Sequence, residues 1–245
     1  MQRLDRVLAR HGLGSRREVG HLVRAGKVTV DGESERDGAR RIDPLRQEIA
    51  VNGAVLPPRI QWHLLCHKPQ NVVTSTSDPR DPCLLDLIPE AVWRADYSPV
   101  GRLDKDTTGL IWLTTDGELI HRLTHPRWKL PKRYRVTLRD PATPEDIRAF
   151  TTGEIVLDGE PVLPAFLDLG SDPREVGVTL REGRYHQVKR MFHARGNEVL
   201  ALARVGFGPL TLGPDLPVGS FRLPSDAEER AMYAAVSLQS PDADG

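Results

Sequence analysis

Residues 101–110 contain the side chains whose types and spacing could do chemistry. Two carboxylates, Asp104 and Asp106, are bracketed there by two glycines and two threonines, just ahead of an apolar run typical of a buried strand. This composition favours a tightly turned loop that presents one acid at the mouth of a cleft. A carboxylate in such a position can stabilise or attack a centre that develops positive charge. Spacing alone also fits an ordinary Asp/Thr/Gly turn, so the choice depends on the rest of the chain.

The composition is that of a folded protein kept in a reducing compartment. The 245 residues are 39% apolar and 28% charged, enough for one large domain or two smaller ones. No apolar run approaches the roughly 18 residues that span a bilayer, and the N-terminus lacks the apolar region of a secretory signal. The two cysteines, Cys66 and Cys83, form no CxxC pair. We therefore expect a cytoplasmic protein without disulfides, a thiolate zinc site or a membrane partner.

The charges balance overall but are unevenly placed along the chain. There are 34 basic and 34 acidic residues, yet residues 1–60 hold 12 Lys and Arg against 8 Asp and Glu. Residues 121–139 hold seven basic residues and no acidic one. Such gathering of cations is typical of a face presented to a polyanion. The alternative is a set of solvated surface arginines, which charge alone does not exclude.

The first 58 residues predict two short helices followed by small strands. Leu4, Val7 and Leu8 have amphipathic helical spacing up to about residue 11. Ser15 and Glu18 have the spacing of a capping box that starts a second helix, which ends near residue 26. Alternating valines at 28–30 and a turn at 52–53 predict strands. The following Pro57-Pro58 pair is the expected linker.

This order of elements resembles an S-four-type RNA-binding domain, a small module named after a ribosomal protein. The resemblance is carried by L-x-x-V-L-A at 4–9, G-x-x-S-R-R-E at 12–18 and G-x-V-x-V-x-G at 26–32. A capped helix with arginines in its first turn offers cations and free amides to a phosphate. The RNA-binding residues expected here are Arg16, Arg17 and Lys27. The alternative is a charged helix-turn-helix without a ligand.

The remaining chain, residues 62–238, mixes strand and helix patterns without repeats. Strands are expected at 62–66, 109–114, 132–138 and 176–180, and helices through residues 119–123, 144–150 and 186–195. This irregular alternation predicts an α+β fold with a mainly antiparallel sheet and flanking helices. We therefore predict two domains, 1–58 and 62–238, and a frayed tail at 239–245.

Four ordered motifs in the second segment resemble those of pseudouridine synthases. G-R-L-D-x-x-T-x-G-L at 101–110 is similar to the active-site signature, and its Thr-Thr form resembles the ribosomal RNA branch with an N-terminal S-four-type domain. His67-Lys68-Pro69 resembles an early K-P block, although His67 stands where Asn or Tyr is more familiar. Lys132-Arg133-Tyr134 is similar to a K-x-Y block. Residues 182–191 resemble the late block, and 204–208 match a weaker R-[IV]-x-x-G ending.

The resemblance implies that uridine in ribosomal RNA is converted into pseudouridine. The C1′–N1 glycosidic bond breaks and the same uracil rejoins through C5, so neither a cofactor nor a metal is needed. Asp104 is then the expected catalytic acid, with Asp106 as the local competitor. Lys189 would hold Asp104 ionised and Tyr134 would stack on the uracil. The expected supporting residues of this active site are Arg102, Tyr134, Val188 and Lys189.

The reaction also predicts contacts to the RNA backbone around the cleft. The target base must leave its stack at a cost of a few kcal/mol, which phosphate contacts can offset. The basic run at 121–139 and the late block supply the expected residues, Arg127, Lys132 and Arg184. Four histidines in these regions have no third ligand at metal-site spacing, so we expect no metal.

Two other classes of function compete with this interpretation. A non-catalytic RNA-binding or ribosome-assembly factor could keep the fold, but it would need none of Asp104, Tyr134 and Lys189. A glycosidase or nucleosidase is disfavoured by the missing second acid and by the RNA-binding head. Within the family, residues 185–189 favour the 16S enzyme and the first motifs favour the 23S enzymes. We expect a monomer that acts on 16S ribosomal RNA, free or in an assembly intermediate.

Overall fold

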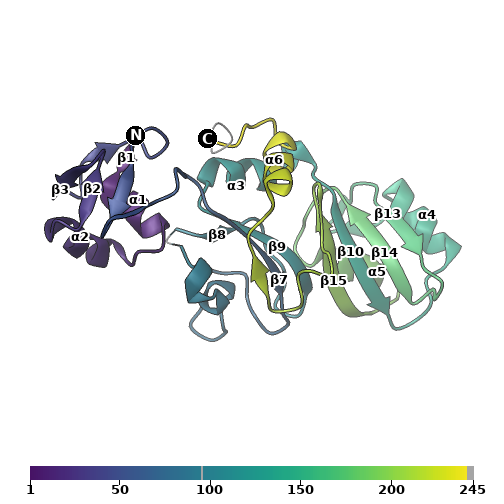
Figure 1. The fold of residues 1–245 in the computed structure, drawn as a ribbon. Helices are drawn as coiled ribbons and strands as arrows, with labels where there is room; N and C mark the ends of the chain where they lie inside the picture. Colours follow the sequence, from purple (N-terminus) through teal and green to yellow (C-terminus); the bar gives the residue numbers. More distant parts are fainter. Residues whose placement is uncertain (95, 242–245) are drawn as a thin grey trace.

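The computed structural model describes residues 1–94 and 96–241 as a small N-terminal head beside a larger sheet domain (Figure 1). An extended segment that contains Pro57 and Pro58 connects them. The α+β class expected from the sequence is confirmed. The division into domains at 58 and 62 stays a prediction. The tail expected at 239–245 falls partly on 242–245, which lie outside the described residues.

The head has two helices packed on short strands, as the sequence predicts. The capping box is present, since Ser15 Oγ accepts from the Glu18 amide at 3.4 Å and Glu18 Oε2 accepts from the Ser15 amide at 2.7 Å. Gly26 follows the second helix with φ +70°, a left-handed conformation that glycine adopts at little cost. The elements are β1 (Gln2–Arg3), α1 (Leu4–Arg10), α2 (Arg16–Arg24), β2 (Val28–Val30), β3 (Glu33–Glu35), β4 (Arg41–Ile42), β5 (Ile49–Val51) and β6 (Ala54–Val55).

The larger domain is built on one sheet, whose main path runs β13-β14-β10-β15-β9-β7-β17. Its pairings are antiparallel except where β9 meets β15 in parallel. The mainly antiparallel sheet is thus confirmed. The strands are β7 (His63–Lys68), β8 (Ser98–Pro99), β9 (Thr108–Thr114), β10 (Lys132–Leu138), β13 (Phe166–Leu169), β14 (Glu175–Leu180), β15 (Val199–Phe207), β16 (Leu210–Thr211) and β17 (Phe221–Arg222), with a separate hairpin of β11 (Val156–Leu157) and β12 (Glu160–Pro161).

The helices form separate apolar cores with the two ends of the sheet. Phe150 of α4 and Phe192 of α5 pack with β10, β13 and β14 at one end (Figure 1). Leu119 of α3 and Tyr233 of α6 pack with Trp112 of β9 near the other. The helical elements are α3 (Gly117–Thr124), α4 (Pro144–Thr152), α5 (Gln187–Ala194), α6 (Asp226–Ala234) and the short 3₁₀ turns η1 (Leu84–Leu87), η2 (Glu90–Val92) and η3 (Pro126–Trp128). No helix in the described part of the chain is long and apolar enough to cross a membrane.

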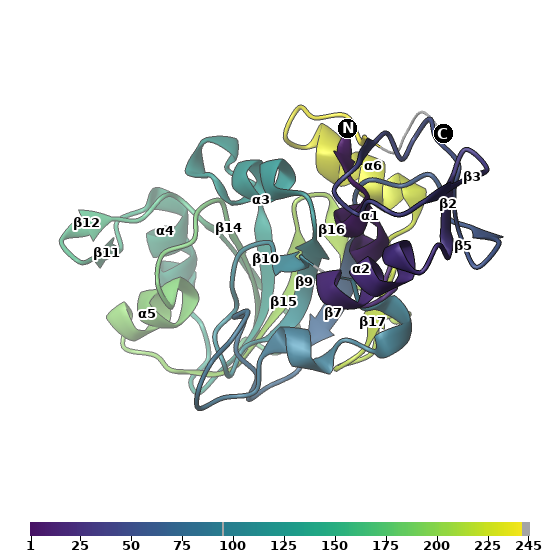
Figure 2. The same cartoon turned by 90° about the vertical axis from the view of Figure 1, so that its left-hand side faces the viewer.

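The head is docked on the sheet domain through polar and aromatic contacts. Arg10 of α1 is only 4% exposed and donates to the carbonyl oxygens of Thr115 at 3.1 Å and Ile60 at 3.3 Å. His11 meets Trp62 edge-on, with ring centroids 5.1 Å apart. Figure 2 views the molecule with this head in front of the sheet. A buried arginine that is bonded to carbonyl oxygens favours one orientation of the head, because another orientation would leave its donors unpaired at a cost in free energy.

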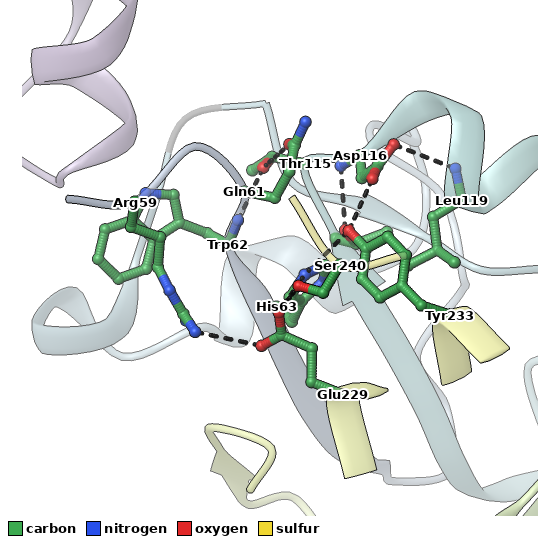
Figure 3. A network of polar contacts seen from close by, with 11 residues as sticks. Arg59, Gln61, Trp62, His63, Thr115, Asp116, Leu119, Glu229, Tyr233 and Ser240 are labelled. Carbon is green, nitrogen blue, oxygen red and sulfur yellow. Dashed lines mark hydrogen bonds and ion pairs between the residues drawn. The ribbon is translucent and has the colours of Figure 1, made fainter. Parts of the chain in front are cut away.

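A buried polar network ties the linker to the C-terminal helix and the start of α3 (Figure 3). Arg59 reaches Glu229 at 3.2 Å, and the Tyr233 hydroxyl donates to Asp116 Oδ2 at 2.7 Å. Asp116 Oδ1 in turn accepts from the first-turn amides of α3. His63 lies fully buried beside Tyr233, and burial lowers its pKa to about 3. The network therefore joins Asp116, which caps α3, to helix α6, which carries Tyr233 and Glu229.

Candidate active site

A cleft of about 790 Å³ opens across the middle of the sheet. Its walls come from six segments far apart in the sequence: the loop at 73–78, the loop before β9, the end of α3 with the turn after it, strand β10, the loop before α5 and strand β15. Asp104, Tyr134 and Val188 all line it. The motif residues that the sequence set apart are thus brought to one cavity.

The loop that carries Asp104 is held by bonds on both sides of that residue. Gly101 begins the turn with φ +75°, where a side chain would be strained. The Thr74 hydroxyl donates to the Leu103 carbonyl at 3.0 Å and accepts from the Leu103 amide at 3.2 Å. The Thr107 amide then donates back to the Asp104 carbonyl at 3.1 Å. The glycine and the threonines of this region therefore hold the Asp104 carboxylate in a defined position.

Lys68 supports the same loop from inside the protein. Its side chain is buried, and the ammonium group donates to the carbonyl oxygens of Lys105 at 3.2 Å and Pro69 at 2.9 Å. Burial lowers the pKa of Lys68 to about 8, although nearby acids oppose this shift. The early K-P block therefore helps to fix the position of the loop that carries Asp104. Sequence reasoning matched this block without assigning Lys68 a role.

Gly109 permits the closest backbone approach in the site. It pairs in parallel with Arg204 where β9 meets β15, and its φ is +123°. A Cβ atom at Gly109 would overlap the backbone of Arg204. The glycine of the signature motif is therefore required by packing between the two strands that flank the cleft.

Two side chains of the late block, Lys189 and His186, lie next to the Asp104 carboxylate. Lys189 Nζ lies 3.6 Å from Asp104 Oδ2, and His186 Nε2 lies 3.4 Å from Asp104 Oδ1. Lys189 Nζ also contacts Asp106 Oδ1 at 2.5 Å. The Asp104 side chain is 27% exposed and the Asp106 side chain 67%. Partial burial by itself would raise the pKa of the Asp106 carboxyl. The hydrogen bond from Lys189 outweighs this effect, so the pKa of Asp106 is lowered.

Tyr134 lies beside a buried arginine at the back of the cleft. Burial raises the pKa of the Tyr134 phenol, while the neighbouring Arg204 opposes the shift, so the hydroxyl is protonated at neutral pH. Arg204 is 2% exposed and its Nε donates to the Leu110 carbonyl at 2.9 Å. Sequence reasoning noted the R-V-G-F-G ending but assigned Arg204 no role. The arginine at the start of that motif was the sequence feature that could have indicated a role for Arg204.

The expected RNA contacts are placed unevenly. Arg102 and Lys132 line the cleft, and burial, followed by the charge of Arg204, lowers the pKa of Lys132 to about 8. Arg127 is exposed on η3, outside the residues that line the cleft. Arg184 lines the cleft, but its guanidinium donates to three carbonyl oxygens of the β11–β12 hairpin. Three exposed cations lie on the head, away from this cavity: Arg16, Arg17 and Lys27.

Several cations of the basic run at 121–139 form hydrogen bonds or ion pairs with other parts of the protein. Arg122 bonds to Glu118 and to carbonyls after α6, and Arg133 bonds to the carbonyls of Gly208 and Leu210. Arg139 pairs with Glu198 at 2.9 Å. Because these cations already have partners within the protein, the basic composition of this run does not by itself indicate RNA contacts.

Comparison with known proteins agrees with this geometry. Residues 62–194 match the family model described as RNA pseudouridylate synthase, and residues 2–44 match that of the S4 domain. The chain belongs to the RNA pseudouridylate synthase family. This membership confirms the resemblance inferred from the four motifs and makes the protein a pseudouridine synthase with an N-terminal S4 domain.

Individual relatives are similar over nearly their whole length. Ribosomal small subunit pseudouridine synthase A of Escherichia coli K12 is 41% identical over 236 residues, 94% of this chain and 98% of that protein. The uncharacterized RNA pseudouridine synthase YtzG of Bacillus subtilis is 40% identical over 223 residues, 90% of this chain and 93% of that protein. A crystal structure described as pseudouridylate synthase has a TM-score of 0.65 at 34% identity and covers 95% of this chain and 100% of its own.

The close approach at Gly109 generates a stability prediction. Gly109→Ala should lower the free energy of unfolding by about 2 kcal/mol or more, because it combines a left-handed φ with overlap on the Arg204 backbone. It should also remove most RNA modification. Gly117→Ala is the matched control, since a Cβ there meets nothing within 4 Å. Urea unfolding measures both variants, and wild-type stability in Gly109→Ala would contradict the packing account.

Proposed function

We propose that this protein isomerises a specific uridine of 16S ribosomal RNA to pseudouridine. The observation that carries the proposal is the Asp104 carboxylate in the central cleft, 3.6 Å from Lys189, with Tyr134 in the same cavity. The choice of small-subunit RNA is supported by the name of the Escherichia coli relative. The S4 domain supports RNA as the partner.

Asp104 is proposed as the group that acts on the ribose. Breaking the C1′–N1 bond builds positive character on the sugar, which an ionised carboxylate stabilises. Asp104 either adds to C1′ or removes the proton at C2′, and both routes use its carboxylate, with the Lys189 ammonium 3.6 Å away. The freed uracil turns and bonds to C1′ through C5. On the first route this breaks the C1′–Asp104 bond, and on the second the proton taken from C2′ returns to C2′. The C5 proton is then lost and N1 gains a proton. Atoms are conserved, so the proposal includes no cofactor or metal.

The remaining groups are proposed to hold the RNA. The Tyr134 ring stacks on the uracil, and Val188 and the cleft walls exclude water from it. Arg102 and Lys132 face the backbone of the flipped nucleotide. Arg16, Arg17, Lys27 and Arg127 contact phosphates further away, which position the RNA without reading its sequence.

We propose that the acting unit is a monomer. We propose that it acts in the cytoplasm, on free ribosomal RNA or on an assembling particle.

Mapping pseudouridine in cells that lack the gene tests the proposed substrate. One position in 16S RNA should carry uridine in the deletion strain, and the wild-type gene should restore pseudouridine there. A missing site in 23S RNA instead would reassign the substrate. Unchanged pseudouridine in both RNAs would reject an action on ribosomal RNA.

The assignment of the acid generates a mutational prediction. Asp104→Asn should lower the rate by about 10⁴-fold or more, because the amide cannot supply the charge that the ribose needs. RNA binding should stay nearly intact. Asp106→Asn is the matched control, and it should keep most activity because Asp106 is the more exposed partner of Lys189 and does not line the cleft. An active Asp104→Asn with an inactive Asp106→Asn would move the role to Asp106.

The proposed phosphate contacts of the head predict a change in salt dependence. Each neutralised phosphate contributes about −0.7 to −0.9 to the slope of log affinity against log salt concentration. Arg16→Ala combined with Arg17→Ala should weaken binding and reduce the slope by about one per residue at most, with kcat unchanged on saturating RNA. Arg41→Ala combined with Arg46→Ala, at two exposed head residues outside α2, is the charge-matched control. An unchanged slope in the double variant would remove α2 from the RNA interface.

A further inference from the structure

Tyr185 is the most exposed large aromatic side chain in the described part of the chain, at 72%. It lines the same cleft as Asp104, in the loop between β14 and α5. A ring that is so exposed gains little from packing within the protein. The mechanism described above does not use it.

The ring of Tyr185 is stacked on its neighbour. The centroids of Tyr185 and His186 are 3.8 Å apart and the planes differ by 18°. His186 in turn contacts Asp104 Oδ1 through Nε2 at 3.4 Å. The two rings therefore form a short stack that begins at the carboxylate and ends in solvent.

The loop that carries this stack is fixed rather than loose. Arg184 donates to the Pro161 carbonyl at 2.6 Å, and its amide donates to Gln187 Oε1 at 2.8 Å. Arg190 donates to the Tyr185 carbonyl at 3.3 Å. His186 has φ +46°, a left-handed conformation that a non-glycine residue keeps only where its surroundings impose it. The direction of the exposed ring is thus set before any ligand arrives.

We propose that Tyr185 and His186 form a stacking platform for a second nucleobase, the unpaired neighbour of the target uridine. This rests on the proposed function and extends it. When the uridine leaves its stack, the adjacent base loses a stacking partner, and the outer face of Tyr185 replaces it.

The lining of the cleft favours a nucleic acid as the occupant of the platform. Six Lys and Arg residues line the cleft against three Asp and Glu, which suits a polyanion. Every base has a π-face, so the platform tolerates different neighbours and contributes to binding more than to reading sequence. It lies beside the carboxylate, where it helps to keep the uridine out of the helix.

Kinetics on RNA test the platform. The probe is an RNA stem-loop that carries the uridine mapped in cells. Tyr185→Ala should lower kcat/KM by about 5- to 150-fold, mainly through KM, while the salt slope and the melting temperature stay the same. Tyr185→Trp should restore activity, because it keeps a π-face. Phe166→Ala is the matched control, since Phe166 is 63% exposed but does not line the cleft.

A fluorescence measurement reports stacking directly. The same stem-loop carries 2-aminopurine next to the target uridine and is bound to Asp104→Asn, which leaves the uridine unreacted. Stacking should quench the probe in this background, and adding Tyr185→Ala should restore its emission.

Unchanged emission and unchanged kcat/KM in Tyr185→Ala would overturn the platform, as would a loss that Tyr185→Trp does not rescue. A Tyr185→Ala defect seen only on ribosomal particles, and not on the stem-loop, would indicate a protein partner and also overturn it. If deletion of the gene changes no uridine, the proposed function fails and the platform fails with it. If the wild-type protein modifies the stem-loop and Tyr185→Ala does so equally, the platform alone fails.

Discussion

Strand β9 meets β15 in parallel at Gly109 and Arg204, and the architecture of the cleft depends on this contact. Strand β9 packs into the apolar core of α3 and α6, while β15 contributes Leu202 to the core of α4 and α5 and Phe207 to that of α3 and α6. The contact brings the loop before β9, with Asp104, across to β10 and α5, which carry Tyr134 and Lys189. Only glycine fits at this point, so a single small residue determines whether the two strands approach closely enough to form one site.

The site is then kept in position by buried cations that bond to backbone oxygens. Lys68 holds the carbonyl of Lys105, and Arg204 holds that of Leu110. Arg10 does the same between the head and the sheet domain. Charged groups are costly to bury unless they are hydrogen-bonded, so an arrangement that broke these contacts would leave a buried charge without compensation. Asp104, the group proposed to act on the substrate, is left 27% exposed.

Local features of the sequence were sufficient to predict helices α1 to α5 and strands such as β2, β7, β9, β10 and β14, whereas the central strand β15 and helix α6 were not predicted. The Ser15–Glu18 capping box, strand β10 and the helix through residues 119–123 depend on neighbours within a few residues, and each is present as expected. The order of the motifs also placed Asp104, Tyr134 and Val188 in one cleft. Contacts between distant residues could not be predicted in this way. Arg10 and Thr115 are 105 positions apart, and nothing in the spacing of either residue points to the other.

The central claim is that Lys189 acts through the charge of Asp104, and the kinetics of two Lys189 variants test it most directly. Steady-state rates on the mapped RNA and RNA affinity would be measured for Lys189→Arg and Lys189→Met. Lys189→Arg should keep substantial activity, because it retains a cation near the carboxylate. Lys189→Met should lose on the order of 100-fold or more in kcat at unchanged RNA affinity. A Met variant with wild-type kcat, or one that loses RNA affinity instead of kcat, would contradict this account.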